Sequence, residues 1–117
     1  MTDIRTRYLS CWNETDPIAR QRLLAESWTE SAGYTDPLAE VKGLQQLDTT
    51  IAAVQVQFPG LVFTPIGDVD AHHQLARFSW GLGPAGAEPV IVGSDVVITD
   101  ADGRIATVLG FLDKVPS

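Results

Sequence analysis

The sequence predicts an α+β roll, in which three helices pack on the concave face of a curved antiparallel sheet. Three observations lead to this fold class. Helical spacing of apolar residues is confined to the first half of the chain, and strand-like segments follow one another in the second half. Only short turns separate these strands, so consecutive strands must pair in the antiparallel sense. The 117 residues form one domain, residues 1–117, whose concave interior suits a small-molecule pocket.

Two helices are predicted at the start of the chain. In residues 4–12 one helical face collects the side chains of Ile4, Tyr8, Cys11 and Trp12. The stretch NETDP then interrupts the pattern. Asp16 can cap a second helix over residues 18–28, and Pro17 suits its first turn, where no backbone donor is needed.

A strand and the most regular helix of the chain come next. The segment SAGYTD, residues 31–36, predicts a strand that stops at Pro37. In residues 44–58 the apolar side chains are spaced by three, four, three and four positions; they are Leu44, Leu47, Ile51, Val54 and Phe58. This spacing predicts a helix that Pro59-Gly60 ends.

Four strands are predicted after the long helix, over residues 61–69, 73–82, 90–99 and 104–113. The turns GPAGAEP and DADG separate the last three of them. Alternation along residues 73–82 assigns Ala76, Phe78, Trp80 and Leu82 to the inner face of the roll. The same alternation turns Arg77 to the outer face.

Composition and charge exclude several classes of partner. The net charge is −7, from 8 basic and 15 acidic residues, and no basic run occurs. We therefore expect no binding to nucleic acid and none to an anionic membrane surface. No apolar run approaches the ~20 residues of a membrane helix. The lone Cys11 excludes an intrachain disulfide, and the charged first residues do not resemble a secretory signal, so we expect a cytoplasmic protein.

Asp36 is the first candidate for a working carboxylate. It precedes Pro37 and follows Tyr34 by two residues. Aspartate before proline is common where a strand ends, because proline disfavours the α region for its predecessor and aspartate bonds readily to nearby backbone. Two interpretations therefore stay open, a strand-ending residue and an active-site group.

Asp95 is the second candidate, because it lies inside the strand-like segment VIVGSDVVIT. Both faces of this segment are mainly apolar. A carboxylate in such a place either has a partner or is kept neutral by a raised pKa. Functional sites contain such carboxylates, but so do structural ion pairs, and a partner subunit that covers the sheet would also explain Asp95.

The order of elements and two motifs resemble the nuclear-transport-factor-2-like superfamily, and within it the SnoaL-like and ketosteroid-isomerase-like branch. One motif is the strand-ending YTDP, which Gly43 follows before the long helix; the other is the closing pattern DVVITDADGRI. The resemblance covers the whole chain and implies a cone-shaped roll of order α-α-β-α-β-β-β-β. This fold carries isomerases, polyketide cyclases, dehydratases, epoxide hydrolases and binding proteins, so it does not decide the reaction.

By resemblance to the ketosteroid isomerases, three residues of this chain would be catalytic. Asp36 of TDP matches their general base, which takes a proton from carbon next to a carbonyl. Tyr8, in the pair Arg7-Tyr8, matches one donor to the enolate oxygen, and Asp95 matches a second donor that is a protonated carboxyl.

The resemblance also implies an apolar pocket around these groups. The expected pocket residues are Trp12, Trp28, Tyr34, Phe78, Trp80 and Val97. Tyr34 stands where the isomerases carry an aliphatic residue, and it could steer the substrate or orient Asp36. The expected ligand is a small apolar carbonyl compound, smaller or flatter than a steroid. We expect no cofactor and no metal, and a homodimer formed through the convex face of the sheet.

Three classes of function stay open at this point. The first is an isomerase or an aldol-type cyclase that works by proton transfer. The second is a hydrolase of the limonene-epoxide-hydrolase type, which needs an arginine between carboxylates, whereas alternation turns Arg77 outward and places Arg104 at a rim. The third is a non-catalytic module that binds a small ligand or forms dimers.

Overall fold

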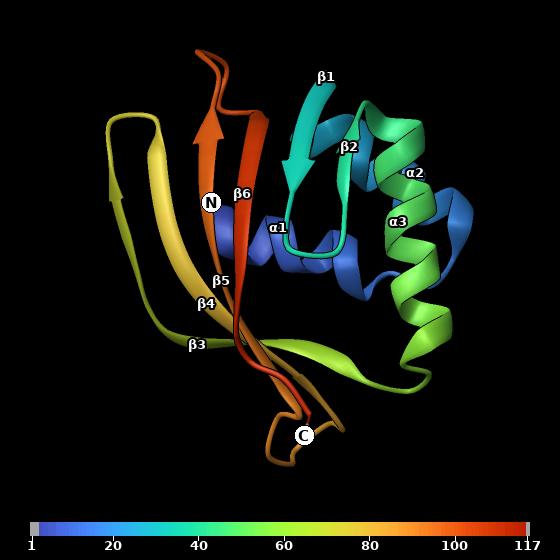
Figure 1. Ribbon diagram of the computed structural model, residues 1–117. Coiled ribbons are helices and arrows are strands. Elements are labelled where there is room, and N and C mark those ends of the chain that lie inside the picture. The colour runs from blue at the N-terminus through green and yellow to red at the C-terminus, as the bar shows by residue number, and fades with distance from the viewer. Residues whose placement is uncertain (1–2, 117) are drawn as a thin grey trace.

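The computed structural model describes residues 3–116, which form three helices and one six-stranded sheet (Figure 1). The helices are α1 Ile4–Asn13, α2 Pro17–Ser27 and α3 Leu44–Gln57. The strands are β1 Trp28–Thr35, β2 Glu40–Lys42, β3 Val62–His72, β4 Leu75–Gly83, β5 Ile91–Thr99 and β6 Ile105–Lys114. The α+β fold class is confirmed, as are the three helices, and their ends lie within about one residue of the expected ones.

The sheet differs from the expected one in two respects. Its strand order is β2-β1-β6-β5-β4-β3, and β1 pairs with β6 in the parallel sense, so the sheet is mixed and not purely antiparallel. A parallel pair needs a long connection, and residues 36–104 lie between these two strands. The short strand β2, which pairs with β1, was not predicted, because three residues are too few for a strand pattern.

The ends of the helices follow from the capping residues. Asp3 accepts a hydrogen bond from the backbone N–H of Thr6 at the start of α1, and Asp16 accepts one from Ala19 at the start of α2. Before α3 the chain passes through Gly43 with a φ of 89°, a conformation that favours glycine. The β1–β2 hairpin can therefore turn directly into the long helix.

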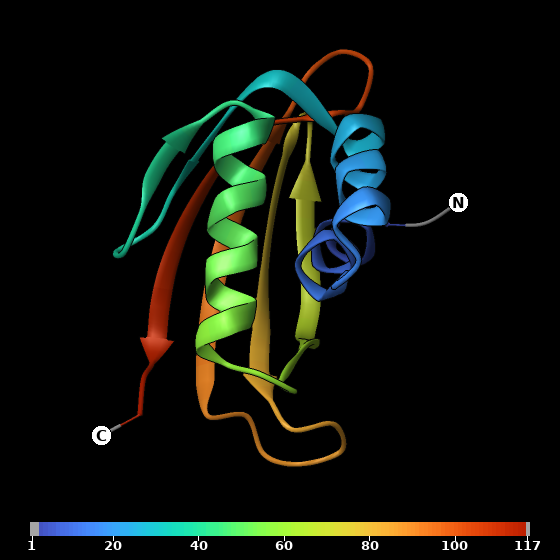
Figure 2. The same ribbon diagram turned by 90° about the vertical axis from the view of Figure 1, so that its right-hand side faces the viewer.

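All three helices lie on one face of the curved sheet, and the core fills the space between them (Figure 2). The largest buried side chains of this core are aromatic: Tyr8, Trp12, Trp28, Tyr34, Phe63, Phe78 and Trp80. Neighbouring rings in this group have centroids 5.2 to 6.2 Å apart, at tilted or edge-on angles that favour aromatic contact.

A buried arginine ties the helices together. Arg20 on α2 is 3% exposed, and its Nε lies 2.6 Å from Asp48 Oδ1 on α3. Its Nη1 donates to the carbonyl of Glu14 and to Gln55 Oε1, each at 3.0 Å. Every contact of this guanidinium thus joins α2 either to α3 or to the end of α1, which fixes the helical layer over the sheet. No helix in the described part of the chain is long and apolar enough to cross a membrane.

Candidate functional site

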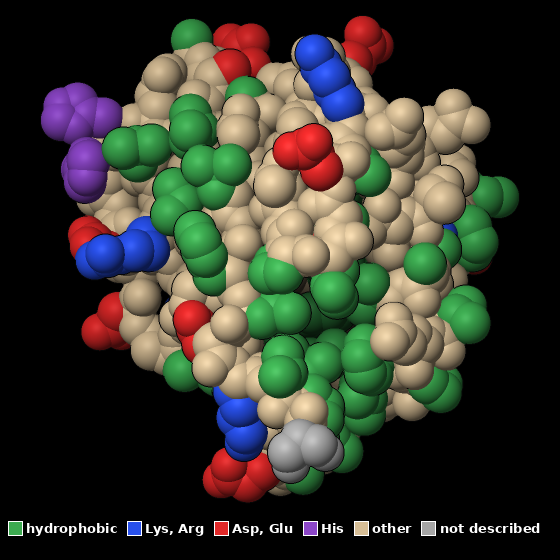
Figure 3. Space-filling model, in the orientation of Figure 1, with side chains coloured by type: hydrophobic (Ala, Val, Ile, Leu, Met, Phe, Trp, Pro, Cys, Tyr) green, Lys and Arg blue, Asp and Glu red, His purple; other side chains and the backbone are tan. Residues whose placement is uncertain are grey.

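A cavity of about 240 Å³ opens between the β1–β2 turn, the C-terminal end of α3 and the end of β6. Its walls are formed by Tyr8, Trp12, Asp36, Leu38, Val54, Gln57, Phe58, Phe63, Trp80, Leu82, Ile91, Leu112, Val115 and Pro116. Apolar side chains surround the hollow in the space-filling view (Figure 3). Among residues 3–116, Asp36 is the one charged residue on these walls, so the cavity suits an apolar ligand that presents a polar group to it.

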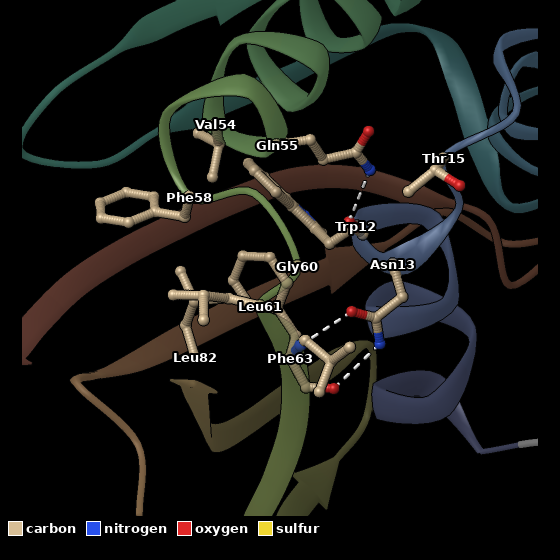
Figure 4. Close-up of a pocket in the computed structure, with 11 residues that line it drawn as sticks. Trp12, Asn13, Thr15, Val54, Gln55, Phe58, Gly60, Leu61, Phe63 and Leu82 are labelled. Carbon is tan, nitrogen blue, oxygen red and sulfur yellow. Dashed lines mark hydrogen bonds between the residues drawn. The ribbon is translucent and has the colours of Figure 1, made fainter. Parts of the chain in front are cut away.

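A second hollow of about 170 Å³ adjoins the cavity (Figure 4). The two share the wall residues Trp12, Val54, Phe58, Phe63 and Leu82. Two polar side chains of the second hollow are already paired: Gln55 Nε2 donates to the Trp12 carbonyl at 3.0 Å, and Asn13 exchanges two hydrogen bonds with the backbone of Phe63. We therefore regard this hollow as an extension of the first cavity and not as a polar site of its own.

Asp36 shapes the turn that ends β1, and it also lies on the cavity wall. Its Oδ1 accepts hydrogen bonds from the backbone N–H groups of Leu38 and Ala39, both at 2.8 Å, so it does shape the turn after β1. Its Oδ2 accepts a hydrogen bond of 2.5 Å from the Tyr34 hydroxyl. The same carboxylate also lines the cavity, where a substrate could reach it.

Tyr8 brings a hydroxyl from α1 to the same cavity. Its ring is buried against Trp28 and Phe78, with centroids 5.8 and 5.4 Å away. Burial raises the pKa of Tyr8 well above its usual value, and the negative charge of Asp95 adds to the effect. Tyr8 is therefore a neutral hydrogen-bond donor across the physiological pH range.

Asp95 lies deeper, on β5, and is 2% exposed. The indole Nε1 of Trp80 donates to its Oδ2 at 2.7 Å. Burial raises the pKa of Asp95 from 3.8 to about 6, although hydrogen bonds from Trp80 and Tyr8 act in the opposite direction. Asp95 thus has a hydrogen-bond partner and a raised pKa; it does not line the cavity, whereas its partner Trp80 does.

The two carboxylates approach each other at Gly110 on β6. A Cβ atom at position 110 would lie 2.5 Å from Asp95 Oδ1 and 3.3 Å from the Cβ of Asp36. The absence of a side chain there leaves room over β6 for the side chain of Asp95 from β5 and for that of Asp36 from the end of β1. Asp36 also raises the pKa of Asp95 through its charge, so the two groups are electrostatically linked.

The other predicted pocket residues divide into two groups. Trp12 and Trp80 lie on the cavity wall. Trp28, Tyr34, Phe78 and Val97 are buried in the core behind that wall and do not line it. Val54 and Phe58 had been identified as members of the α3 stripe, and Leu82 as an inner-face residue, but none of them as a pocket residue. Sequence reasoning missed the remaining wall residues altogether: Leu38, Gln57, Phe63, Ile91, Leu112, Val115 and Pro116.

The arrangement of the arginines bears on the hydrolase hypothesis. Arg77 lies on the outer face, as alternation predicts, and pairs with Asp70 at 2.8 Å with both side chains largely exposed. Asp113 accepts a hydrogen bond from Ser94 on the same outer face. No arginine lines the cavity in residues 3–116. That part of the chain also holds no cluster of three or more His, Cys, Asp or Glu side chains suited to a metal ion.

Comparison with known proteins decides the family. No protein-family model matches the chain, and no curated protein does. A solved structure from Agrobacterium tumefaciens str. C58, provisionally assigned as an isomerase of the SnoaL-like family, is 40% identical over 94% of each chain, with a TM-score of 0.89. The chain belongs to the SnoaL-like family. The resemblance inferred from the motifs is thereby confirmed.

Other SnoaL-like and related structures share the fold at low identity. A provisionally assigned polyketide cyclase from Sinorhizobium meliloti is 19% identical over 94% of each chain, with a TM-score of 0.71. A protein with a ketosteroid isomerase-like fold from Catenulispora acidiphila DSM 44928, in complex with trimethylamine, is 16% identical over 94% of this chain and 85% of its own, with a TM-score of 0.72. These neighbours carry different provisional activities, so the reaction has to be argued from the site.

Proposed function

We propose that this SnoaL-like protein is an enzyme that moves a proton at the carbon next to a carbonyl, as an isomerase or a cyclase. The observation that carries the proposal is the presence of the Asp36 carboxylate and the Tyr8 hydroxyl on the walls of one apolar cavity. A base and a hydrogen-bond donor that face the same ligand are the groups such chemistry needs. The substrate is a small apolar carbonyl compound.

In the first step Asp36 takes the proton from the α-carbon of the substrate. The electron pair of the broken C–H bond forms the carbon–carbon double bond of an enolate, and the carbonyl electron pair moves to oxygen. Tyr8 donates a hydrogen bond to that oxygen. An isomerase then returns the proton to another carbon; in a cyclase the enolate carbon attacks a second carbonyl, whose oxygen takes up the proton.

Asp95 acts in this scheme by controlling the Tyr8 proton. When Asp95 is ionised, the hydrogen bond from Tyr8 is drawn to its carboxylate. When Asp95 is neutral, Tyr8 is free to donate to the substrate, and the carboxyl proton can support Tyr8 in turn. The raised pKa of Asp95, about 6, supports this role, because it increases the neutral fraction at a given pH.

The test is exchange of α-protons for deuterium in D2O, followed by NMR for a panel of small apolar ketones. The wild type should exchange at least one ketone well above the background rate, and Asp36→Asn should abolish the exchange. Tyr8→Phe should lower kcat about 10²- to 10³-fold, the usual cost of losing one oxyanion donor. Equal exchange in wild type and Asp36→Asn would refute the assignment of the base.

A non-catalytic binding module is the second candidate. The predominance of apolar walls, including the Trp12 and Trp80 rings, favours it, because such a cavity can bind an apolar ligand without chemistry. Quenching of tryptophan fluorescence by the same ketones, with no exchange for any of them, would favour this function. The outward position of Arg77 gives a hydrolase of the epoxide type no comparable support.

We also propose that the protein forms a homodimer through the outer face of the sheet. Large apolar side chains are exposed there on β3, β4 and β6: Ile66, Leu75, Leu109 and Phe111. Light scattering at micromolar concentration should give twice the chain mass, and Phe111→Glu should give the monomer. Val56→Glu, on the exposed side of α3, is the control that should leave the dimer intact. A monomeric wild type would contradict the proposal.

A further inference from the structure

We propose that Tyr34 is a positioning residue for Asp36, which fixes the orientation of the carboxylate and leaves one defined oxygen to act as the base. The inference rests on the proposed function, in which Asp36 takes the proton. It also gives Tyr34 a different role from contact with the substrate, because Tyr34 is 4% exposed and is not part of the cavity wall.

The side chains of Tyr34 and Asp36 are in direct contact. Tyr34 lies near the end of β1, and Asp36 directly follows the last residue of that strand, so the two-residue spacing turns both side chains to the same side. The Tyr34 hydroxyl lies 2.5 Å from Asp36 Oδ2, in the range of strong O–H···O⁻ hydrogen bonds. Tyr34 itself is held by the core, with its ring centroid 5.4 Å from that of Trp12.

Counting acceptor sites identifies the reactive oxygen. An ionised carboxylate has about four lone-pair sites, two on each oxygen. On Asp36 Oδ1 both are taken, by the backbone N–H groups of Leu38 and Ala39 at 2.8 Å. On Oδ2 the Tyr34 hydroxyl takes one, which leaves one site free. The free site on Oδ2 is therefore the one that can accept the substrate proton.

The same contacts prevent rotation of the carboxylate. A turn of the side chain about its last bond would break the hydrogen bond to Tyr34 or those to the β1–β2 turn. A base held in one orientation is always aligned with the substrate proton. Positioning contributes to catalysis because unproductive orientations of the base are not populated.

Tyr34 can play this part because it stays protonated. Burial raises the pKa of its phenol far above the usual value, and the hydrogen bond to Asp36 and the charge of Asp36 raise it further. Asp95 and Tyr8 are the other titratable groups that act on it. Throughout the working range Tyr34 is thus a donor, and Asp36 is the acceptor.

The first test is the separate effect on kcat and on KM of ketone exchange in Tyr34→Phe. Loss of the hydrogen bond lets the Asp36 carboxylate rotate, so we expect kcat to fall roughly tenfold with KM little changed. Thr35→Val removes a hydroxyl from the neighbouring residue on the opposite face of β1, and it should leave both constants unchanged. A kcat that stays at the wild-type level in Tyr34→Phe would overturn the proposal.

The second test needs no turnover. The chain contains only two tyrosines, so replacement of both by 3-fluorotyrosine should give two ¹⁹F resonances, which Tyr34→Phe assigns. The Tyr34 resonance should lie at a different chemical shift in Asp36→Asn than in the wild type, because the amide replaces the acceptor of its hydroxyl, while the Tyr8 resonance should move less. A Tyr34 resonance at the same chemical shift in both proteins would overturn the contact. If the resonance moves and no ketone exchanges, the contact stands and the proposed reaction fails.

Discussion

Gly93 on β5 faces Trp80 on β4, and the Trp80 indole occupies the space that a side chain at position 93 would need. A Cβ atom at Gly93 would lie only 2.2 Å from Cζ2 of the indole. The indole reaches along β5 from there, so that its Nε1 bonds to Asp95, two residues beyond Gly93. A missing side chain on one strand thus determines how the buried carboxylate is partnered.

The first prediction concerns this glycine. Gly93→Ala should lower the free energy of unfolding by about 1–3 kcal/mol, because the added methyl group must displace a buried indole. Urea denaturation measures the loss, and near-ultraviolet circular dichroism should report the altered tryptophan environment. Gly33→Ala is the control: no atom lies within 4 Å of its added Cβ, so its stability should change little. Equal effects of the two substitutions would contradict the steric argument.

The second prediction concerns the stability cost of the Asp95 charge. Because burial raises the pKa of Asp95 from 3.8 to about 6, the folded protein binds this proton more tightly than the unfolded chain does. The associated stability is fully present below about pH 4 and is lost as the pH rises through about 6. Relative to wild type, Asp95→Asn should therefore become more stable by about 3 kcal/mol between pH 4 and pH 7.

Urea denaturation of both proteins at several pH values measures this difference. The matched control is Asp68→Asn, since Asp68 is an exposed aspartate on β3. The difference in the free energy of unfolding between this variant and the wild type should stay nearly constant between pH 4 and pH 7. If the stability difference between Asp95→Asn and the wild type did not change with pH, the Asp95 carboxyl would be as well solvated in the folded protein as in water.

The third prediction is an upper pH limit for proton transfer. Ionised Asp95 draws the hydrogen bond of Tyr8 away from the substrate, so kcat should fall as the pH rises through about 6. The profile of α-proton exchange against pH measures this limb. Asp95→Asn should remove the limb, because an amide does not ionise. An unchanged limb in this variant would assign the pH dependence to another group.

The fourth prediction compares a buried with an exposed ion pair. Asp48→Asn leaves the charge of Arg20 buried without its carboxylate, and breaking such a pair costs about 3–5 kcal/mol. Asp70→Asn removes the partner of Arg77, where both side chains are largely exposed, and should cost less than about 1 kcal/mol. Thermal or urea denaturation of both variants compares the two losses of stability. Comparable losses would mean that Arg20 does not depend on Asp48.

The local elements of this protein could be read from its sequence because short-range patterns cause them. The stripe from Leu44 to Phe58 predicted α3, Asp16-Pro17 predicted the start of α2, and alternation predicted which side of β4 is buried. The anomalous positions of Asp36 and Asp95 were visible in the same way. An aspartate before a proline and a charge in an apolar strand both conflict with the usual pattern.

The relations between distant segments could not be read in this way. Three features depend on which strands become neighbours. They are the parallel pairing of β1 with β6, the approach of Asp36 and Asp95 at Gly110, and the cavity wall formed by Leu112, Val115 and Pro116. Tyr34 shows the difference most clearly. Its two-residue spacing from Asp36 placed both on one strand face, but only the packing of the core turned its hydroxyl onto the carboxylate and away from the cavity. The sequence by itself determined the elements, the family and the candidate groups; the tertiary structure decided which of these groups meet, because contacts between distant segments depend on strand order and packing.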